Sequence, residues 1–317
     1  MRQLQNNPVF AEACGIHSTS EVPSKYAYCR FLKKLACFND VVQDVLTKAV
    51  NQLRERSPSF GETVAVDATD VKAWANGLHP QTDPDARTGA KQKSSRRIFW
   101  FGYKVHLAVD AGTELPVWFH LTPANAHDGK HLSSVMDAAR QRFPWLQPKY
   151  VLADKGYDSR ECFRYVGEEL HATPVIDVRQ YHSRRLNDSR ACEAYPIITP
   201  QGVRYRCERT PFSPKCPRFG KCPLLPLFVN TANEPTEPTY YERYTNLPHG
   251  SREWKLVYNK RVAVERAFSR LKGFRKLNGL RVRRLAKVWL HTALSIVVAV
   301  VLGLVRFGSG SSRVVAA

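Results

Sequence analysis

Three acidic residues, far apart in the sequence, have surroundings that suit phosphoryl-transfer chemistry. Asp67 and Asp154 each follow a short apolar run, in TVAVD and YVLAD. Glu265 lies among basic residues in the stretch 258–272, YNKRVAVERAFSRLK. Carboxylate oxygens are the ligands that Mg²⁺ prefers, and two such ions close together can activate an attacking oxygen and stabilise a leaving one. The three acids therefore form a candidate two-metal site, provided that the fold brings them together.

The stretch 258–272 has the periodicity of an amphipathic helix. At about 100° per residue, Tyr258, Arg261, Glu265 and Lys272 fall within about 60° of one another. A neighbouring face is apolar and predicts a buried stripe of five residues, Val257, Val264, Ala267, Phe268 and Leu271. Two interpretations of Arg261 stay open. It forms an ordinary i,i+4 ion pair with Glu265 on a solvated helix, worth about a few tenths of a kcal/mol, or it belongs to a functional face that bears one acid and two cations.

The elements expected around the acids alternate between strands and helices. Strands are predicted at 63–67, 98–110, 115–121, 150–153 and 173–176, and helices at roughly 129–142 and 159–170. This order predicts an α/β fold with a mixed sheet flanked by helices. Asp67 and Asp154 fall at the ends of predicted strands, where sites in such sheets tend to form. Asp70 is a near neighbour, but Asp67 follows the apolar run directly and is the preferred candidate.

The rest of the chain divides by composition. Residues 76–97 are rich in glycine, proline, aspartate and lysine and predict a mobile basic loop. Helical periodicity is lost over 180–256, which predicts a β-rich or irregular insertion subdomain. We therefore expect four parts: an N-terminal helical region over 1–60, the first part of the core over 61–179, the insertion over 180–256, and C-terminal helices over 257–317 that complete the core.

The charge balance indicates a polyanionic partner. The 317 residues contain 48 Lys+Arg and 28 Asp+Glu, a net charge of +20. Nucleic acid is favoured over a membrane surface, because the basic residues are spread along the chain and no basic amphipathic anchor stands out.

Residues 289–305 are apolar but short for a bilayer, and they predict a helix buried beneath the sheet. The first residues, MRQLQNNPVF, lack the apolar core of a signal peptide, so a cytoplasmic protein is expected.

The eight cysteines are unevenly spread, which favours reduced thiols over a disulfide framework. Cys207, Cys216 and Cys222 form a candidate zinc site, since they lie near one another in the sequence. Their spacing contains no CxxC pair, so ordinary reduced cysteines are the favoured interpretation.

Four positions of the predicted helix match a known signature. Tyr258-x2-Arg261-x3-Glu265-x6-Lys272 resembles the Y-(2)-R-(3)-E-(6)-K pattern of bacterial insertion-sequence transposases of the DDE type. The segments VDAT and LADKGYD, around Asp67 and Asp154, resemble those around the two catalytic aspartates of these enzymes. GYKVHLAVD at 102–110 and TPANAHD at 122–128 resemble the stretch between them. The three acids also follow the family's order, and the resemblance covers about residues 60–300.

The resemblance implies an RNase H-like core in which Asp67, Asp154 and Glu265 hold two Mg²⁺ or Mn²⁺ ions. It implies nicking of double-stranded DNA at transposon ends and attack of the freed 3′-hydroxyl on the other strand or on target DNA. It also implies a homodimer on paired ends, associated with the nucleoid and without a membrane.

Three other residues of the signature would contact DNA. The resemblance implies that Tyr258, Arg261 and Lys272 bind phosphates near the cut.

Two further interpretations of the chain stay open: a catalytically silent DNA-binding derivative, and an RNase H-like nuclease without strand transfer. No helix-turn-helix pattern is evident before residue 60, so we expect a DNA-end-binding segment to be missing or to come from another reading frame.

Overall fold

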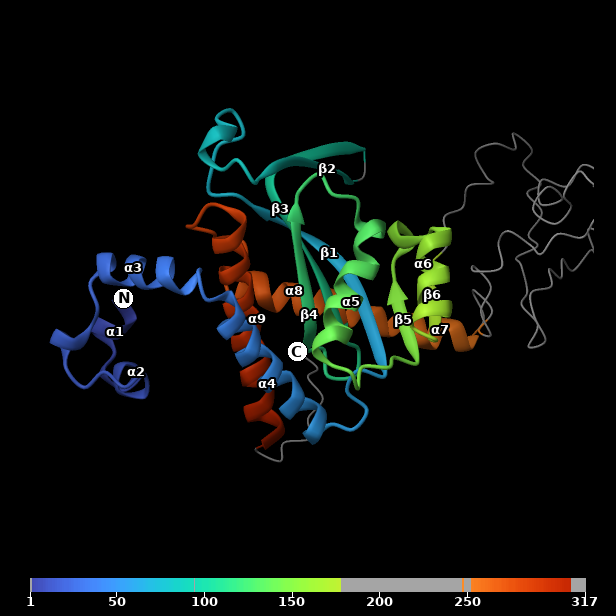
Figure 1. Cartoon of the computed structure of the whole chain (residues 1–317), viewed down its shortest axis with the longest axis horizontal. Coiled ribbons are helices and arrows are strands. Elements are labelled where there is room, and N and C mark those ends of the chain that lie inside the picture. The colour runs from blue at the N-terminus through green and yellow to red at the C-terminus, as the bar shows by residue number, and fades with distance from the viewer. Residues whose placement is uncertain (1, 94, 178–246, 248–251, 309–317) are drawn as a thin grey trace, which may run out of the picture.

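A mixed sheet forms the centre of the molecule. The computed structural model describes residues 2–93, 95–177, 247 and 252–308 (Figure 1). Within this part of the chain the sheet has six strands: β1 (Thr63–Lys72), β2 (Arg87–Lys93), β3 (Arg96–Asp110), β4 (Pro116–Pro123), β5 (Tyr150–Ala153) and β6 (Thr173–Ile176). Their order is β2-β3-β1-β5-β6, with β4 paired to β3 outside this path. β3 is antiparallel to its partners, whereas β5 is parallel to β1 and β6, which confirms the predicted mixed sheet.

The pairing of β1 places Asp67 differently from the prediction. β1 pairs with β5 only over Thr63–Ala65. Its pairing with β3 continues to Lys72, because β3 is long enough to supply partners for the whole strand. Asp67 therefore lies inside β1, just beyond the part that β5 covers, and the expectation that it ends a strand is wrong.

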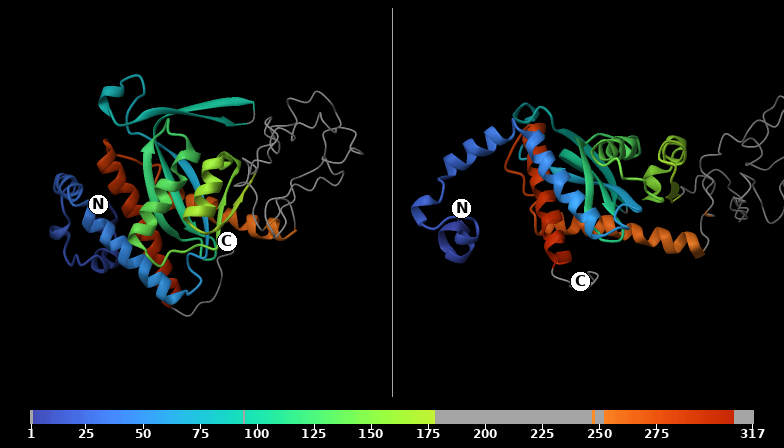
Figure 2. Two further views of the ribbon diagram at one scale, coloured as in Figure 1. Left: turned by 45° about the vertical axis from the view of Figure 1, so that its right-hand side comes forward. Right: turned by 60° about the horizontal axis from the view of Figure 1, so that its bottom comes forward.

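Helices cover both faces of the sheet. Neighbouring residues of a strand point to opposite faces. Trp118 of β4 packs on Phe143, at the end of α5 (Leu132–Arg142), with ring centroids 5.9 Å apart. The next residue, Phe119, packs at 5.3 Å on Trp289 of α9 (Leu285–Gly308). Helices α5 and α9 therefore lie on opposite faces, and the views in Figure 2 show the sheet between them.

The predicted helix at 258–272 is interrupted near its start. Helix α7 (Arg252–Tyr258) runs into a 3-10 turn (Asn259–Arg261), and α8 (Val262–Gly273) follows. The turn is tighter than an α-helix because the Val262 N–H bonds to the Asn259 carbonyl, three residues back. The predicted stripe is buried at Val264, Ala267, Phe268 and Leu271. It packs α8 against β1 and β3.

Two segments differ from their predictions. Residues 87–93 of the expected basic loop form β2, because the first half of β3 supplies hydrogen-bond partners that the local sequence pattern does not reveal. Residues 252–256, the end of the expected insertion, belong to α7. Most of that insertion, 178–246 and 248–251, lies outside the described residues, and the four predicted parts of the chain stay a prediction.

The N-terminal residues are helical, as expected. They form α1 (Arg2–Asn6), α2 (Pro8–Ala13), α3 (Lys25–Leu35) and α4 (Asn39–Arg56). Helices α1 to α3 stand away from the sheet (Figure 1), whereas α4 lies along α9. After β5, α6 (Arg160–Arg164) continues into a π-helical turn (Tyr165–Glu169) that leads to β6.

Helix α9 contains the apolar stretch 289–305. By length and composition, Leu285–Phe307 could cross a membrane, but half of its most apolar window is buried within the protein. The buried side packs on β4 and α4. The prediction that this helix is buried against the sheet is therefore confirmed for one side of α9, and the other side is exposed.

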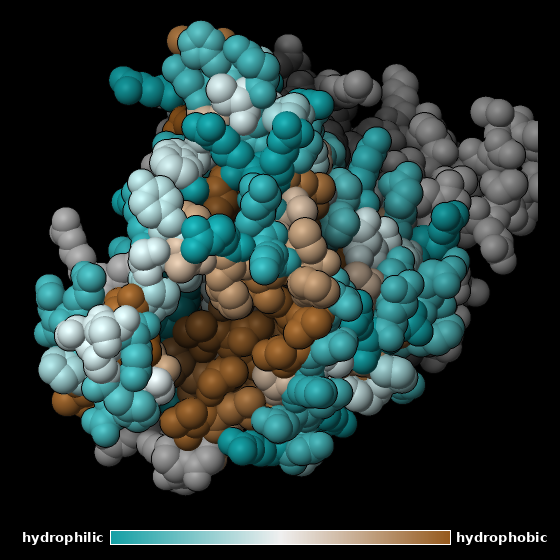
Figure 3. Space-filling view, turned by 60° about the vertical axis from the view of Figure 1, so that its left-hand side comes forward, coloured by the Kyte–Doolittle hydropathy of each residue, from teal (hydrophilic) through white to brown (hydrophobic). Residues whose placement is uncertain are grey.

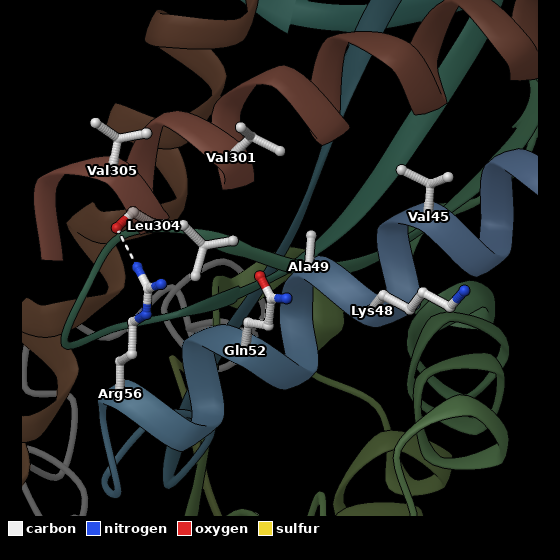
Figure 4. Close-up of a pocket in the computed structure, with 8 residues that line it drawn as sticks. All are labelled: Val45, Lys48, Ala49, Gln52, Arg56, Val301, Leu304 and Val305. Atoms are coloured by element: carbon white, nitrogen blue, oxygen red, sulfur yellow. Dashed lines mark hydrogen bonds between the residues drawn. The ribbon is translucent and has the colours of Figure 1, made fainter. Parts of the chain in front are cut away.

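An apolar groove, which we call the α4–α9 groove, opens between α4 and α9. Seen from the side of α3, α4 and α9, the surface is hollowed and apolar (Figure 3). The groove has a volume of about 540 Å³, and eight residues line it (Figure 4): Val45, Lys48, Ala49, Gln52, Arg56, Val301, Leu304 and Val305. At one end, Arg56 Nη1 donates to the Leu304 carbonyl at 2.6 Å.

Candidate active site

Asp67 lies close to a second carboxylate. Its Oδ1 accepts the Ala68 N–H at 2.7 Å. Burial, and then the nearby charge of Asp154, raise the pKa of Asp67 to about 7, although the hydrogen bond from Ala68 and the charge of Arg261 lower it. Two carboxylates that share a site resist being ionised together. The site therefore favours either a proton or a cation between these two acids.

Asp154 is held by the backbone that follows it. It directly follows β5 and caps a 3-10 turn (Lys155–Tyr157), where its Oδ1 accepts the Gly156 N–H at 2.7 Å. A Cβ at residue 156 would lie 2.7 Å from the same oxygen. Glycine is therefore required if the Asp154 carboxylate is to stay in this position.

Arg261 joins the third acid to the first. Its Nη2 lies 2.6 Å from Glu265 Oε1, and its Nη1 lies 3.8 Å from Asp67 Oδ2. The Arg261 side chain is 17% exposed, against 52% for Glu265. Burial lowers the pKa of Arg261, but its hydrogen bond to Glu265 and the charges around it outweigh this and leave the pKa raised. Arg261 is thus a permanent cation that contacts both carboxylates, which goes beyond an isolated i,i+4 pair.

The three predicted acids do not meet at one point. The structure brings Asp67 near Asp154, and it connects Glu265 to Asp67 only through Arg261. Within the described part of the chain, no three acidic, histidine or cysteine side chains are arranged to hold a metal ion. Convergence of all three acids on metal ions therefore stays a prediction.

The buried hydroxyl of Tyr157, near the aspartates, bears on whether a hydrated cation fits between them. Tyr157 is 1% exposed, and its hydroxyl has no hydrogen-bond partner among the described residues. Burial, then the charges of Asp67, Asp128 and Asp154, raise its pKa well above the ordinary value, so it stays protonated. An unpaired buried hydroxyl costs about 1–3 kcal/mol. A cation that carries water, placed between the aspartates, would supply this missing partner, so the residues fit such an ion.

The sequence pattern does not single out Lys104, which contacts an acid near the two aspartates. Lys104 of β3 donates to Asp128 Oδ1 at 2.7 Å and to the Ala126 carbonyl at 2.8 Å. Asp128 also contributes to the raised pKa of Asp67. The only signal in the sequence is a single lysine in the apolar strand GYKVHLAVD.

Three histidines form a neutral cluster at the start of α5. His106 and His131 have ring centroids 4.8 Å apart, and His120 stacks on His131 at 5.5 Å. His106 is fully buried, and its Nε2 lies 2.9 Å from Thr122 Oγ1. Burial, and then the other two histidines, lower the pKa of His106 to about 2. The rings therefore stay uncharged and pack the start of α5, next to Asp128, onto the sheet.

The other signature residues lie along the same edge. Lys272 Nζ is 3.5 Å from Asp70 Oδ1, and Lys91 Nζ is 2.6 Å from the same oxygen. Asp70 is therefore neutralised by two lysines. Tyr258 stacks on Trp254, with ring centroids 4.4 Å apart.

A glutamate in the β3–β4 turn fixes α8 on the sheet. Glu114 accepts from Arg266 Nη1 at 2.6 Å and from Arg270 Nη1 at 2.7 Å, while Arg270 Nη2 reaches its backbone carbonyl at 2.7 Å. We call this arrangement the Glu114 clamp. It joins residues that are more than 150 positions apart, so no local sequence pattern could predict it.

Some expected sites lie elsewhere. The candidate zinc ligands, Cys207, Cys216 and Cys222, lie outside the described residues. The α4–α9 groove is lined by none of the predicted site residues.

Comparison with known proteins finds a matching family and a relative. Residues 58–301 match the model of the transposase DDE domain family. The chain is also 28% identical, over 225 residues, to a transposase for insertion sequence element IS1106 from Neisseria meningitidis serogroup B. That similarity covers 59% of this chain and 70% of the relative. The family match extends over most of the chain and includes both aspartates and the glutamate, and the chain therefore belongs to the DDE transposase family.

Proposed function

We propose that this transposase cuts DNA strands at insertion-sequence ends and transfers the freed 3′-hydroxyls to target DNA. In the proposal, Asp67, Asp154 and Glu265 hold two divalent ions. The observation that supports it most is the proximity of Asp67 and Asp154, two carboxylates whose mutual repulsion a cation would relieve. The RNase H-like core inferred from the sequence is consistent with the mixed, helix-flanked sheet.

Mg²⁺ or Mn²⁺ fits the chemistry of these oxygen ligands. Such ions, when bound, activate a water or hydroxyl oxygen and stabilise the leaving oxygen. The chain's own groups prepare for them. The Gly156 N–H holds the Asp154 carboxylate in place, Asp67 must release its proton, and Tyr157 offers a hydroxyl to water around the ion.

The DNA backbone would lie along the edge where the signature residues gather. Tyr258, Arg261 and Lys272 are the proposed phosphate contacts, because they flank Glu265 and two of them are cations. A guanidinium or ammonium group beside a scissile phosphate offsets the negative charge that develops during cleavage. The net charge of +20 supports binding to double-stranded DNA as a whole.

The assembly and location follow from the same proposal. We expect a homodimer that pairs two transposon ends, in the bacterial cytoplasm at the nucleoid and without a membrane. Ordinary reduced thiols, in preference to zinc ligands, remain the proposed state of Cys207, Cys216 and Cys222.

The test is a nicking assay on double-stranded DNA that carries the terminal inverted repeats flanking the reading frame. With Mg²⁺ we expect nicks at the repeat ends and, with a target plasmid, joined products. Asp154→Asn should lower both by at least about a hundredfold, whereas Asp70→Asn should leave nicking within about threefold, because Asp70 is paired to lysines. Nicks without joined products would indicate a nuclease, and metal-independent DNA binding without nicks would indicate a silent derivative.

A further inference from the structure

Arg261 lies where a cation between two of the proposed metal ligands would lie. Its guanidinium contacts Glu265 Oε1 at 2.6 Å through one nitrogen and approaches Asp67 Oδ2 to 3.8 Å through the other. Each carboxylate thus faces the same positive group. Among the ion pairs of the described residues, Arg261 is the only side chain that contacts two of the three acids.

The guanidinium is held firmly in this position. It is largely shielded from solvent, and it cannot release its charge by losing a proton at any pH that a protein survives. The Tyr258 ring supports it from the side, with the guanidinium carbon 5.7 Å from the ring centroid. A divalent ion that is to bind both Asp67 and Glu265 must approach the same carboxylate oxygens.

We infer that Arg261 is a positioning residue that stands in for a metal ion in the metal-free protein, and that a divalent ion must displace its guanidinium to bind both Asp67 and Glu265. The inference rests on the proposed two-metal function. It explains how Glu265, half exposed, is linked to Asp67 through one guanidinium before any ion arrives. It also couples two events, because the displaced guanidinium becomes available to a DNA phosphate only once the ion has bound.

The test measures Mn²⁺ binding to the full chain without DNA, by the loss of the free-ion electron paramagnetic resonance signal. Arg261→Gln removes the competing cation, so we expect Mn²⁺ to bind roughly threefold to tenfold more tightly, as for the loss of a partly exposed ion pair. Lys260→Gln is the matched control. It removes one charge from the adjacent exposed residue, for which no ion pair with Asp67 or Glu265 is present in the described part of the chain. We expect less than about a twofold change there.

The outcomes separate the inference from the proposed function. If Arg261→Gln and the wild type bind Mn²⁺ equally, or if both variants tighten binding alike, the displacement idea is wrong while metal-dependent nicking can still stand. If neither protein binds Mn²⁺ and Mg²⁺-dependent nicking is absent, both proposals fail.

A second measurement needs no variant. The displaced guanidinium would be more accessible, so Mn²⁺ should raise phenylglyoxal modification of Arg261 in the wild type by about twofold or more, as its 17% exposure increases. Arg266, which is already 58% exposed and belongs to the Glu114 clamp, serves as the internal control and should not change. Unchanged or reduced modification of Arg261 would overturn the inference.

Discussion

Two regions of the molecule, the α4–α9 groove and the acidic edge of the sheet, by which we mean Asp67, Asp154 and Glu265 with Arg261, are built on opposite principles. At the acidic edge, charged groups are positioned by partners: Asp154 by a backbone N–H, and Asp67 and Glu265 by Arg261. In the groove, apolar side chains of two long helices are left open, and Val305 is 62% exposed. Positions at the edge should therefore affect chemistry more than stability. Substitutions at exposed positions in the groove should affect neither nicking nor stability. Four predictions test this contrast between the two regions.

The largest effect is expected from loss of a proposed metal ligand. Asp154→Asn should lower the nicking rate by at least about a hundredfold, because an amide is a weaker metal ligand and Asp67 would be the remaining carboxylate of the pair. Its unfolding midpoint should stay equal or rise, since the variant removes the repulsion that raises the pKa of Asp67. A large loss of stability would show that Asp154 is mainly structural.

A smaller effect is expected from a methyl group beside that ligand. Gly156→Ala places a Cβ 2.7 Å from Asp154 Oδ1, so the carboxylate must move. We expect Mn²⁺ affinity to fall about tenfold, the usual cost of disturbing the group that orients a ligand. Gly167→Ala is the matched control, because no atom lies within 4 Å of its added Cβ. Equal affinities in the two variants would contradict the role given to the Gly156 N–H.

The pH dependence should report on Asp67. Its pKa, raised from 3.8 to about 7, means that the folded protein keeps a proton that the unfolded chain has lost. Without metal, its contribution to the free energy of unfolding should therefore fall as pH rises from about 4 to 7. Mn²⁺ must expel this proton, so its affinity should rise up to about tenfold per pH unit below pH 7 and level off above.

Two measurements check that assignment. Titrations with Mn²⁺ at several pH values should show the rise and the plateau, and Asp67→Asn should remove the corresponding fall in stability. A flat affinity between about pH 5.5 and 7, or an unchanged stability profile in the variant, would place the titrating proton elsewhere.

The smallest effect is expected in the groove. Val305→Ser should change the free energy of unfolding by no more than about 0.5 kcal/mol, because this side chain is mostly exposed. Its neighbour Leu304, 6% exposed, is the contrast: Leu304→Ala should cost about 2–4 kcal/mol. Chemical denaturation measures both. If either variant reduced nicking while folded, the separation between groove and acidic edge would be wrong.

The sequence predicts what depends on neighbouring residues. Apolar runs mark most of the strands, and short motifs around Asp67, Asp154 and Glu265 are enough to mark the candidate acids. The helix stripe through Val264 and Leu271 follows from periodicity alone, and both side chains are buried.

What the sequence could not predict depends on distant contacts. The strand β2 exists because β3 extends far enough to pair with it. The continuation of β1 past Asp67 has the same cause. The contact of Arg261 with Asp67 joins residues that only the packing of α8 on the sheet brings together. Helical geometry places Arg261 beside Glu265, but it contains no information about the strand opposite.

The Glu114 clamp has a consequence for how this protein can change over time. Because Glu114 ties Arg266 and Arg270 to the β3–β4 turn, the helix that bears Glu265 is positioned by the sheet itself. The three residues of the clamp all lie outside the segment between β6 and α7. We therefore expect that segment to be replaceable by exchange with the corresponding segment of a related transposase, leaving the acidic edge intact.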